Sequence, residues 1–195
     1  VIPIGDYMLR HAAVLCKQIN DNGRPDFSVS INVSVKQLQQ KDYISRVLDI
    51  LTDVGVNFEN ITLEITEGLE ITDLRHANML FDDLRERGIK IAIDDFGTGY
   101  SSLSYMREMS VDLIKIDRAF VHDLGNNVHS QAFIRLITEL SHSMGKKVCI
   151  EGVETAEQMA YCVKADADLI QGWFYYKAMP ANDIKDLFYM KQYAA

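Results

Sequence analysis

Cysteine and proline are scarce in this 195-residue sequence, and it contains no long run of apolar residues. The three cysteines are odd in number and show no CxxC spacing. A disulfide framework and a zinc site are therefore not expected, and we interpret all three as buried small apolar residues. No apolar stretch approaches the about 20 residues of a membrane span, and the first residues lack the basic region and apolar core of a signal peptide. These absences predict a cytoplasmic chain without a membrane segment.

Positive charge is also in deficit, since 20 Lys and Arg residues stand against 28 Asp and Glu residues and the net charge is −8. Nucleic-acid polymers bind through clustered Lys and Arg side chains, so we exclude them as partners. A small phosphorylated ligand is still compatible with this charge, because a bound metal ion can supply positive charge locally.

The remaining composition is that of an ordinary folded domain. Hydrophobic residues make up 48% of the chain and charged residues 25%, and 195 residues are enough for a substantial core. No Pro/Ser-rich linker, low-complexity tract or internal repeat divides the sequence. We therefore expect residues 1–195 to form a single domain.

Strand-like segments alternate with amphipathic, helix-like segments along the chain. The expected strands are residues 27–34, 61–66, 90–95, 113–117, 147–153 and 169–173. The expected helices are residues 6–20, 42–54, 69–87, 130–144 and 155–164, with Gly88 and Gly145 as C-caps of the third and fourth. This alternation predicts an α/β protein with a parallel sheet, either an open doubly wound sheet or a (β/α)₈ barrel.

Polar residues favour the barrel, because nearly every expected strand carries one at its C-terminal end, where barrel enzymes build their sites. A complete barrel needs eight strands and typically about 250 residues. The pattern yields six strands, and the chain opens almost directly into a helix. We therefore expect the first two strands of the barrel to be missing from this chain.

Six polar residues lie on the six successive strands: Asn32, Glu64, Asp94, Lys115, Glu151 and Gln171. In a barrel they converge on one mouth, where carboxylates and an amide oxygen would repel one another without a cation. Hard oxygen ligands of this kind suit Mg²⁺ or Mn²⁺. The adjacent Asp95 would point to the opposite face of a regular strand from Asp94, so both reach a metal only if the backbone turns at the strand end.

Lys115 is a charged residue inside an apolar strand, and a buried ammonium needs carboxylate partners or a metal-bound water. The alternative interpretation is that Lys115 forms an ion pair with Asp117 or Glu151 and has no catalytic role. The segment Gly97–Gly99 lacks the lysine of a P-loop and follows two carboxylates, so we interpret it as a flexible loop after metal ligands and not as a phosphate cradle. The sequence is equally compatible with Glu154 as a functional residue and with Glu154 as a solvated loop residue.

Six motifs occur in order between Val1 and Pro180: Asn32-Val33-Ser34, Glu64-Ile65-Thr66-Glu67, Asp94-Asp95-Phe96-Gly97-Thr98-Gly99-Tyr100-Ser101-Ser102-Leu103, Lys115-Ile116-Asp117, Glu151-Gly152-Val153-Glu154-Thr155 and Gln171-Gly172. Together they resemble the EAL domain family of cyclic di-GMP phosphodiesterases. The resemblance implies a TIM-like (β/α)₈ barrel of the EAL type whose first strand runs antiparallel. It also implies two Mg²⁺ or Mn²⁺ ions and hydrolysis of cyclic di-GMP to linear pGpG, a reaction of bacterial second-messenger signalling.

The resemblance also implies roles for individual residues. Asn32, Glu64 and Asp94 resemble ligands of the first metal, while Asp94 as a bridge, Asp95 and Glu151 resemble ligands of the second. Lys115 looks like the group that orients the attacking water, in a catalytic set with Glu151 and Glu67. Glu67 also looks like the anchor of the loop formed by residues 94–103. The residues implied to contact substrate are Asp95, Gln171 and Glu154.

Two other interpretations are open beside the enzyme, and one departure from the family pattern bears on the first of them. The tripeptide Glu-Ala-Leu does not occur in the sequence, and its Glu would be a further metal ligand. The first alternative is an inactive EAL-like module that binds cyclic di-GMP or a protein partner. The second is an enolase-like metal barrel with Lys115 as base, which does not account for the Asp-Asp-Phe-Gly-Thr-Gly loop. All the other metal ligands that the resemblance implies are present, so we favour the enzyme. A homodimer is compatible with this interpretation, and so is a fused sensory or GGDEF domain in the parent protein.

Overall fold

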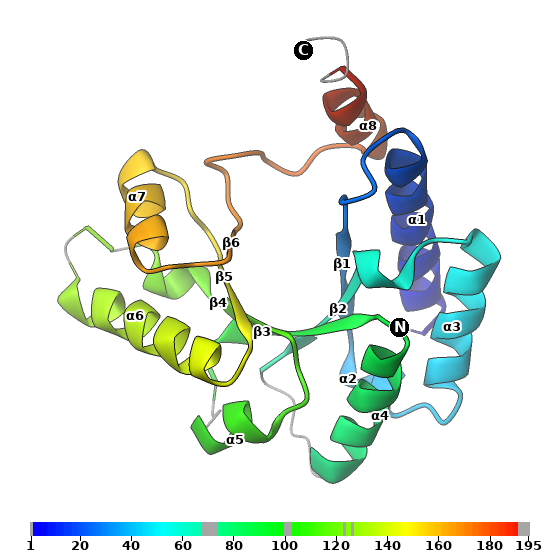
Figure 1. The fold of residues 1–195 in the computed structure, drawn as a ribbon, viewed down its shortest axis with the longest axis horizontal. Helices are drawn as coiled ribbons and strands as arrows, with labels where there is room; N and C mark the ends of the chain where they lie inside the picture. The colour runs from blue at the N-terminus through cyan, green and yellow to red at the C-terminus, as the bar shows by residue number, and fades with distance from the viewer. Residues whose placement is uncertain (1, 68–73, 100–102, 123, 126, 191–195) are drawn as a thin grey trace. The chain divides into compact units, whose positions relative to one another are not determined.

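The protein structure is a computed structural model that describes residues 2–67, 74–99, 103–122, 124–125 and 127–190. In this part of the chain the strands are β1 (Val29–Val33), β2 (Ile61–Thr66), β3 (Lys90–Phe96), β4 (Leu113–Ile116), β5 (Lys147–Ile150) and β6 (Leu169–Ile170). The strands follow one another in the sheet in chain order, and the pairs β3–β4, β4–β5 and β5–β6 are parallel (Figure 1). Parallel neighbours separated by helices are the βα units that the sequence predicts.

The chain groups into two compact units. The first unit consists of Val1–Glu64, Met79–Lys90 and Ala178–Ala195, and the second consists of Ile65–Asn78 and Ile91–Lys177. The expectation of a single domain over residues 1–195 stays a prediction.

The first unit is built on the long helix α1 (Ile2–Asp21), which contacts β1 and α3 (Tyr43–Val54). Ala13, Cys16 and Ile19 lie on one face of α1 and are completely buried, as the helical period requires of a face that packs on a core. Other helices of this unit are the short α2 (Val35–Leu38) and α8 (Ala181–Met190), and α4 (Leu74–Glu86) has its C-terminal part here.

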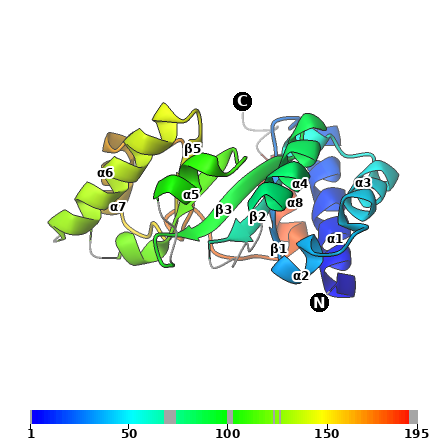
Figure 2. The ribbon, with the colours of Figure 1, turned by 90° about the horizontal axis from the view of Figure 1, so that it is seen from below.

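The second unit has β-branched strands at its centre, with Ile91, Ile93, Ile114, Val148 and Ile150 all buried. Its helices are α5 (Leu103–Glu108), α6 (Val128–Ser143) and α7 (Ala156–Lys164). Helix α6 contacts β5, and α6 and α7 lie side by side (Figures 1 and 2). Long Ile and Val runs buried on both faces are typical of a parallel strand covered by helices.

Three strands of the second unit are shorter than predicted, and the first of them, β4, ends at Ile116 and not at residue 117. β5 ends at Ile150 and not at residue 153, because Gly152 turns the backbone into the left-handed region with φ of 71°. β6 ends at Ile170 and not at residue 173. The prediction that Glu151 and Gln171 lie within strands is therefore wrong, since each directly follows its strand.

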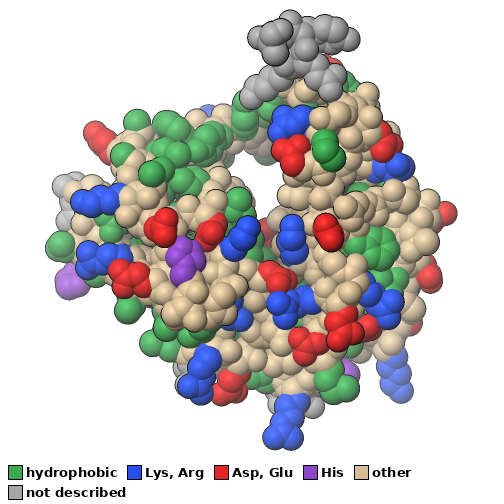
Figure 3. Space-filling model, viewed as in Figure 1, with side chains coloured by type: hydrophobic (Ala, Val, Ile, Leu, Met, Phe, Trp, Pro, Cys, Tyr) green, Lys and Arg blue, Asp and Glu red, His purple; other side chains and the backbone are tan. Residues whose placement is uncertain are grey.

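The aromatic run after β6 is exposed and does not continue the sheet core. Trp173, Phe174, Tyr175 and Tyr176 are between 41% and 60% exposed, and apolar side chains gather in the region of the second unit where α7 lies (Figure 3). The ammonium of Lys177 lies 4.9 Å from the centroid of the Trp173 ring, a cation–π contact. Of these four residues, Trp173 lies in the predicted strand 169–173, and it faces solvent instead.

Helix boundaries differ from the expected ones mainly at the start of each helix. α1 begins at Ile2 and not at residue 6, α6 begins at Val128 and not at residue 130, and the helices α2, α5 and α8 were not predicted. The predicted helix over residues 69–87 is observed as α4 from Leu74, while residues 68–73 lie outside the described part. Among the described residues, no helix combines the length and apolar character needed to cross a bilayer.

All three cysteines are buried thiols, which confirms their interpretation as small apolar residues. Burial raises the pKa of Cys16 and of Cys162 to about 11. Both thiols therefore stay protonated at neutral pH, as expected of structural rather than reactive cysteines.

Candidate metal centre

Asp94 and Asp95 lie next to each other near the end of β3, where the strand is irregular. Ile93 is paired with Ile114 of β4 and Phe96 with Ile116, so β3 has one residue more than β4 over this interval. Asp95 takes up the extra residue with φ of 55°, in the left-handed region that Asp adopts more readily than most residues. Because of this bulge, the two neighbouring side chains do not have to point to opposite faces of the sheet.

The bulge brings carboxylates of the second unit together. Oxygen atoms of Asp94, Asp95 and Glu151 all lie within 4.8 Å of one another. Asp94 is buried at 9% exposure and Glu151 is partly buried just beyond the end of β5. In the described part of the chain, this is the group of acidic, His or Cys side chains whose atoms converge closely enough to hold a metal ion.

Lys115 of β4 lies against this cluster and is only 3% exposed. Its Nζ atom is 2.8 Å from Oδ1 of Asp94 and 2.7 Å from Oε1 of Glu151. The prediction that a buried ammonium here contacts carboxylates is thus confirmed. Losing either carboxylate would leave a charge in a poorly solvated place, so the three side chains form one electrostatic unit.

The cluster holds more negative charge than Lys115 neutralises. The pKa of Asp95 is raised, first by burial of its carboxyl group and then by the charges of Asp94 and Asp117 and a hydrogen bond with Asp117. The positive charge of Lys115 lowers it in part. Crowded carboxylates of this kind are relieved by a bound cation, and their hard oxygen donors fit Mg²⁺ or Mn²⁺.

Glu67 fixes the loop that follows the two aspartates. The backbone amides of Gly97, Thr98 and Gly99 donate to its Oε2 atom at 2.5, 3.2 and 3.3 Å, and the amide of Glu67 itself donates to the carbonyl of Asp94 at 2.9 Å. Glu67 is 5% exposed, which strengthens these charge-assisted bonds. The first three residues of the loop are therefore tied to a buried carboxylate, while residues 100–102 lie outside the described part.

Two phenylalanines that the sequence did not single out support the same loop. Phe120 and Phe133 stack with ring centroids 4.0 Å apart. A Cβ atom on Gly97 would lie 2.6 Å from the Phe120 ring and 2.8 Å from the Phe133 ring, and Gly97 has φ of 99°. Only glycine fits here, which the sequence alone could not show because the stacked rings come from segments 23 and more residues away.

Asn32 and Glu64 belong to the first unit, where Asn32 is exposed on β1 and Glu64 is 5% exposed on β2. Their membership of the metal site stays a prediction. Glu154 and Gln171 are exposed in the second unit. The backbone N–H of Gln171 donates to the backbone carbonyl of Ile150 at 2.9 Å, which keeps Gln171 at the end of β5. Contact of the Glu154 and Gln171 side chains with a substrate also stays a prediction.

Residues 1–178 match the model of the EAL domain. The signaling protein YkoW of Bacillus subtilis is 34% identical over 185 residues, which are 95% of this chain and 23% of YkoW. The bifunctional diguanylate cyclase/cyclic di-GMP phosphodiesterase MucR of Pseudomonas aeruginosa is 29% identical over 187 residues, 94% of this chain and 27% of MucR. The chain thus spans about a quarter of the length of these relatives.

Solved structures agree with the observed fold. The MucR phosphodiesterase in complex with c-di-GMP has a TM-score of 0.88 at 29% identity, covering 94% of this chain and 74% of that one. The manganese/cy-diGMP complex of Klebsiella pneumoniae BlrP1 has a TM-score of 0.78 at 28% identity, covering 88% of this chain and 43% of that one. These likenesses confirm the predicted fold class, a TIM-like (β/α)₈ barrel of which the described part has six strands.

Proposed function

The chain belongs to the EAL domain family, and on this premise we propose that it hydrolyses cyclic di-GMP to linear pGpG with the help of divalent cations. The observation that carries the proposal is the convergence of Asp94, Asp95 and Glu151 around the buried ammonium of Lys115. Support comes from MucR, which is named as a cyclic di-GMP phosphodiesterase, and from the c-di-GMP complexes of similar structures.

We propose that the site holds two ions that share one ligand. We assign Asp94 as the shared ligand, Asp95 and Glu151 to one ion, and Asn32 and Glu64 to the other. Mg²⁺ and Mn²⁺ are the proposed ions, and the manganese complex of BlrP1 supports the use of a divalent cation. Bound there, the ions would supply the positive charge that stabilises negative charge developing on the phosphoryl oxygens.

Lys115 is the residue that we assign to the attacking water. Its ammonium is held in place by Asp94 and Glu151, so it can donate a hydrogen bond in a fixed direction to a water beside the carboxylates. The water gives up a proton as its oxygen bonds to phosphorus, the bond from phosphorus to the 3′ oxygen breaks, and the departing oxygen takes up a proton. One cyclic phosphodiester thereby becomes a linear dinucleotide with a 5′-phosphate.

The remaining residues position this chemistry. Glu67 keeps the loop after Asp95 in one place through three backbone amides, so the bulge that aims Asp95 is held by a buried carboxylate. Gln171 and Glu154 are assigned to the substrate, at the end of β5 and just beyond it. We further propose that the protein forms a homodimer and that the parent protein carries a fused sensory or GGDEF domain. MucR, by its name, combines a phosphodiesterase with a diguanylate cyclase.

The direct test is to incubate the purified parent protein with cyclic di-GMP and MnCl₂ and to follow pGpG by liquid chromatography, with excess EDTA as the control. Formation of pGpG that stops with EDTA is expected. Tight binding of cyclic di-GMP without any pGpG would instead support the alternative, an inactive EAL-like module that binds cyclic di-GMP. No binding and no turnover would refute both functions.

A further inference from the structure

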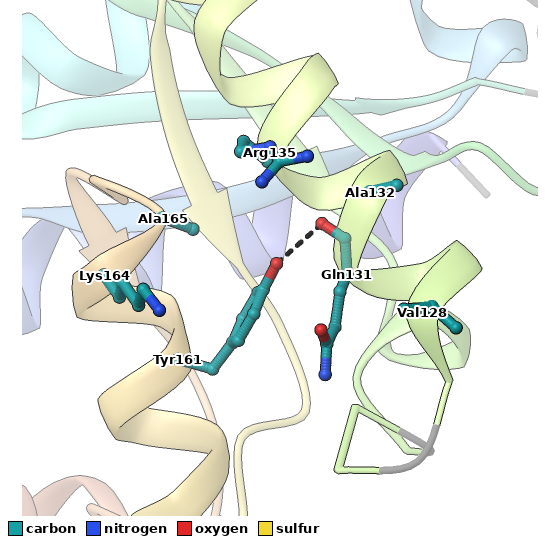
Figure 4. A pocket seen from close by; sticks show the side chains of 7 residues that line it. All are labelled: Val128, Gln131, Ala132, Arg135, Tyr161, Lys164 and Ala165. Atoms are coloured by element: carbon teal, nitrogen blue, oxygen red, sulfur yellow. Dashed lines mark hydrogen bonds between the residues drawn. The ribbon is translucent and has the colours of Figure 1, made fainter.

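A pocket of about 260 Å³ lies between α6 and α7 of the second unit, and none of its lining residues belongs to the carboxylate cluster (Figure 4). On α6 it is lined by Val128, Gln131 and Arg135, whose spacing of three and four residues places them on one face of the helix. On α7 it is lined by Tyr161 and Lys164. Small alanine side chains at positions 132 and 165 leave the space between the helices open.

The charge of this pocket is positive, in a chain whose net charge is −8. Arg135 and Lys164 both line it, and no acidic residue does. The structure shows no ion pair for either side chain among the residues it describes. This contrasts with six arginines that do pair with carboxylates: Arg10, Arg24, Arg46, Arg85, Arg87 and Arg107. Two cations facing one cavity create a site for an anion.

Hydrogen bonds hold the polar neutral groups of the pocket in fixed positions. The hydroxyl of Tyr161 donates to the backbone carbonyl of Gln131 at 2.7 Å, which links α7 to α6 (Figure 4). The side-chain amide of Gln131 donates to the carbonyl of Leu124 at 2.6 Å. Burial raises the pKa of Tyr161 despite the opposing charge of Arg135, so the phenol stays neutral and does not compete with an anion for the cations.

We propose that this pocket binds a small molecule that carries a phosphomonoester group, at a site separate from the carboxylate cluster. A phosphomonoester carries a charge of about −1.5 to −2 at neutral pH, which matches two cations, and arginine presents several donors in the geometry of phosphate oxygens. The volume accommodates the phosphate with a small organic group, which would lie against Val128 and the two alanines. This inference does not depend on the proposed phosphodiesterase activity.

Phenyl phosphate is a suitable probe for this site. Titrating it into the ¹⁵N-labelled protein, with EDTA present so that no metal-bound phosphate forms at the carboxylates, should shift the amide signals of residues 128–135 and 161–165. Phenol, which lacks the phosphate, should leave them unchanged. Shifts confined to other parts of the chain, or no saturable shifts, would overturn the proposal.

Charge variants test the two cations. Arg135→Gln and Lys164→Gln should each raise the dissociation constant of phenyl phosphate about tenfold, the effect of one charge-assisted hydrogen bond. The matched control is Arg107→Gln, because Arg107 is also exposed and in the second unit but does not line the pocket. An equal loss of affinity for phenyl phosphate in all three variants would indicate general electrostatic attraction and would overturn the proposal.

A cavity-filling variant tests the pocket itself while keeping both charges. Ala132→Phe places a large side chain on an exposed helix position that lines the pocket. Binding of phenyl phosphate should be lost although the circular-dichroism spectrum and melting temperature remain those of the original protein. Unchanged affinity in this variant would show that the cavity is not the binding site.

Discussion

The ammonium of Lys115 lies 2.8 Å from Oδ1 of Asp94, so a buried cation on β4 faces a buried carboxylate on β3. The same ammonium also contacts Glu151 beyond β5, at 2.7 Å. Three neighbouring strand ends are thereby linked by one charge network. The three side chains affect one another's protonation and metal binding. Substituting any one of them is therefore expected to change the behaviour of the other two.

Replacing Asp94 by Asn should abolish metal-dependent cleavage of cyclic di-GMP, because the variant loses the charge that both proposed ions share. The measurement is pGpG formation at saturating MnCl₂, together with Mn²⁺ binding by calorimetry. Asp82→Asn, at an exposed position on α4, is the matched control and should leave both unchanged. Turnover of Asp94→Asn at the original rate would remove Asp94 from the site.

Replacing Lys115 by Met should lower the free energy of unfolding by about 3 kcal/mol in metal-free buffer, since Asp94 and Glu151 lose their buried counter-ion. Urea denaturation followed by circular dichroism measures the difference. Added Mn²⁺ should narrow the gap between the variant and the original protein, because a bound cation compensates the same carboxylates. A variant that is equally stable with and without the metal would contradict this electrostatic account.

Glu67→Ala should lower turnover about a hundredfold without unfolding the protein, because the loop after Asp95 loses the acceptor of three amides and shifts out of position. Glu67→Gln is the conservative comparison and should retain more activity, as it keeps one oxygen acceptor. Both variants are to be checked by circular dichroism at the assay temperature. Loss of the folded signal in Glu67→Ala would show that Glu67 is required for folding instead.

Asp168 should contribute to stability at neutral pH and lose this contribution in acid. Burial alone would raise the pKa of Asp168, but hydrogen bonds from His142 at 2.8 Å and from the Val148 amide at 2.8 Å lower it overall. A lowered pKa in the folded state means that the contribution is complete above the unfolded pKa of about 3.9 and disappears as the pH falls through the folded value.

The check is to compare the melting temperatures of the original protein and Asp168→Asn between pH 6 and pH 3. The original protein should melt higher at pH 6, and the difference should shrink below about pH 4. A difference that stays constant over this range would show that ionisation of Asp168 does not stabilise the fold.

The fold class and the identity of the acidic residues could be predicted from the sequence because both depend on local patterns. β2 has the predicted bounds Ile61–Thr66, since a β-branched run ends at a turn on either side. The order of the motifs along the chain is sufficient by itself to indicate the EAL family. Alternation of strands and helices is likewise a short-range property that requires no knowledge of which segments touch.

Tertiary structure alone decided how those residues meet. Regular alternation separates Asp94 from Asp95, and only the extra residue of β3 against β4, with Asp95 at φ of 55°, lets both belong to one cluster. Lys115 and Glu151 are 36 positions apart in the sequence, and strand register sets the 2.7 Å between them. The pocket between α6 and α7 likewise depends on helix packing, because neither helix forms a cavity by itself. Local sequence patterns determine which elements form, whereas distances between elements depend on packing that involves the whole chain.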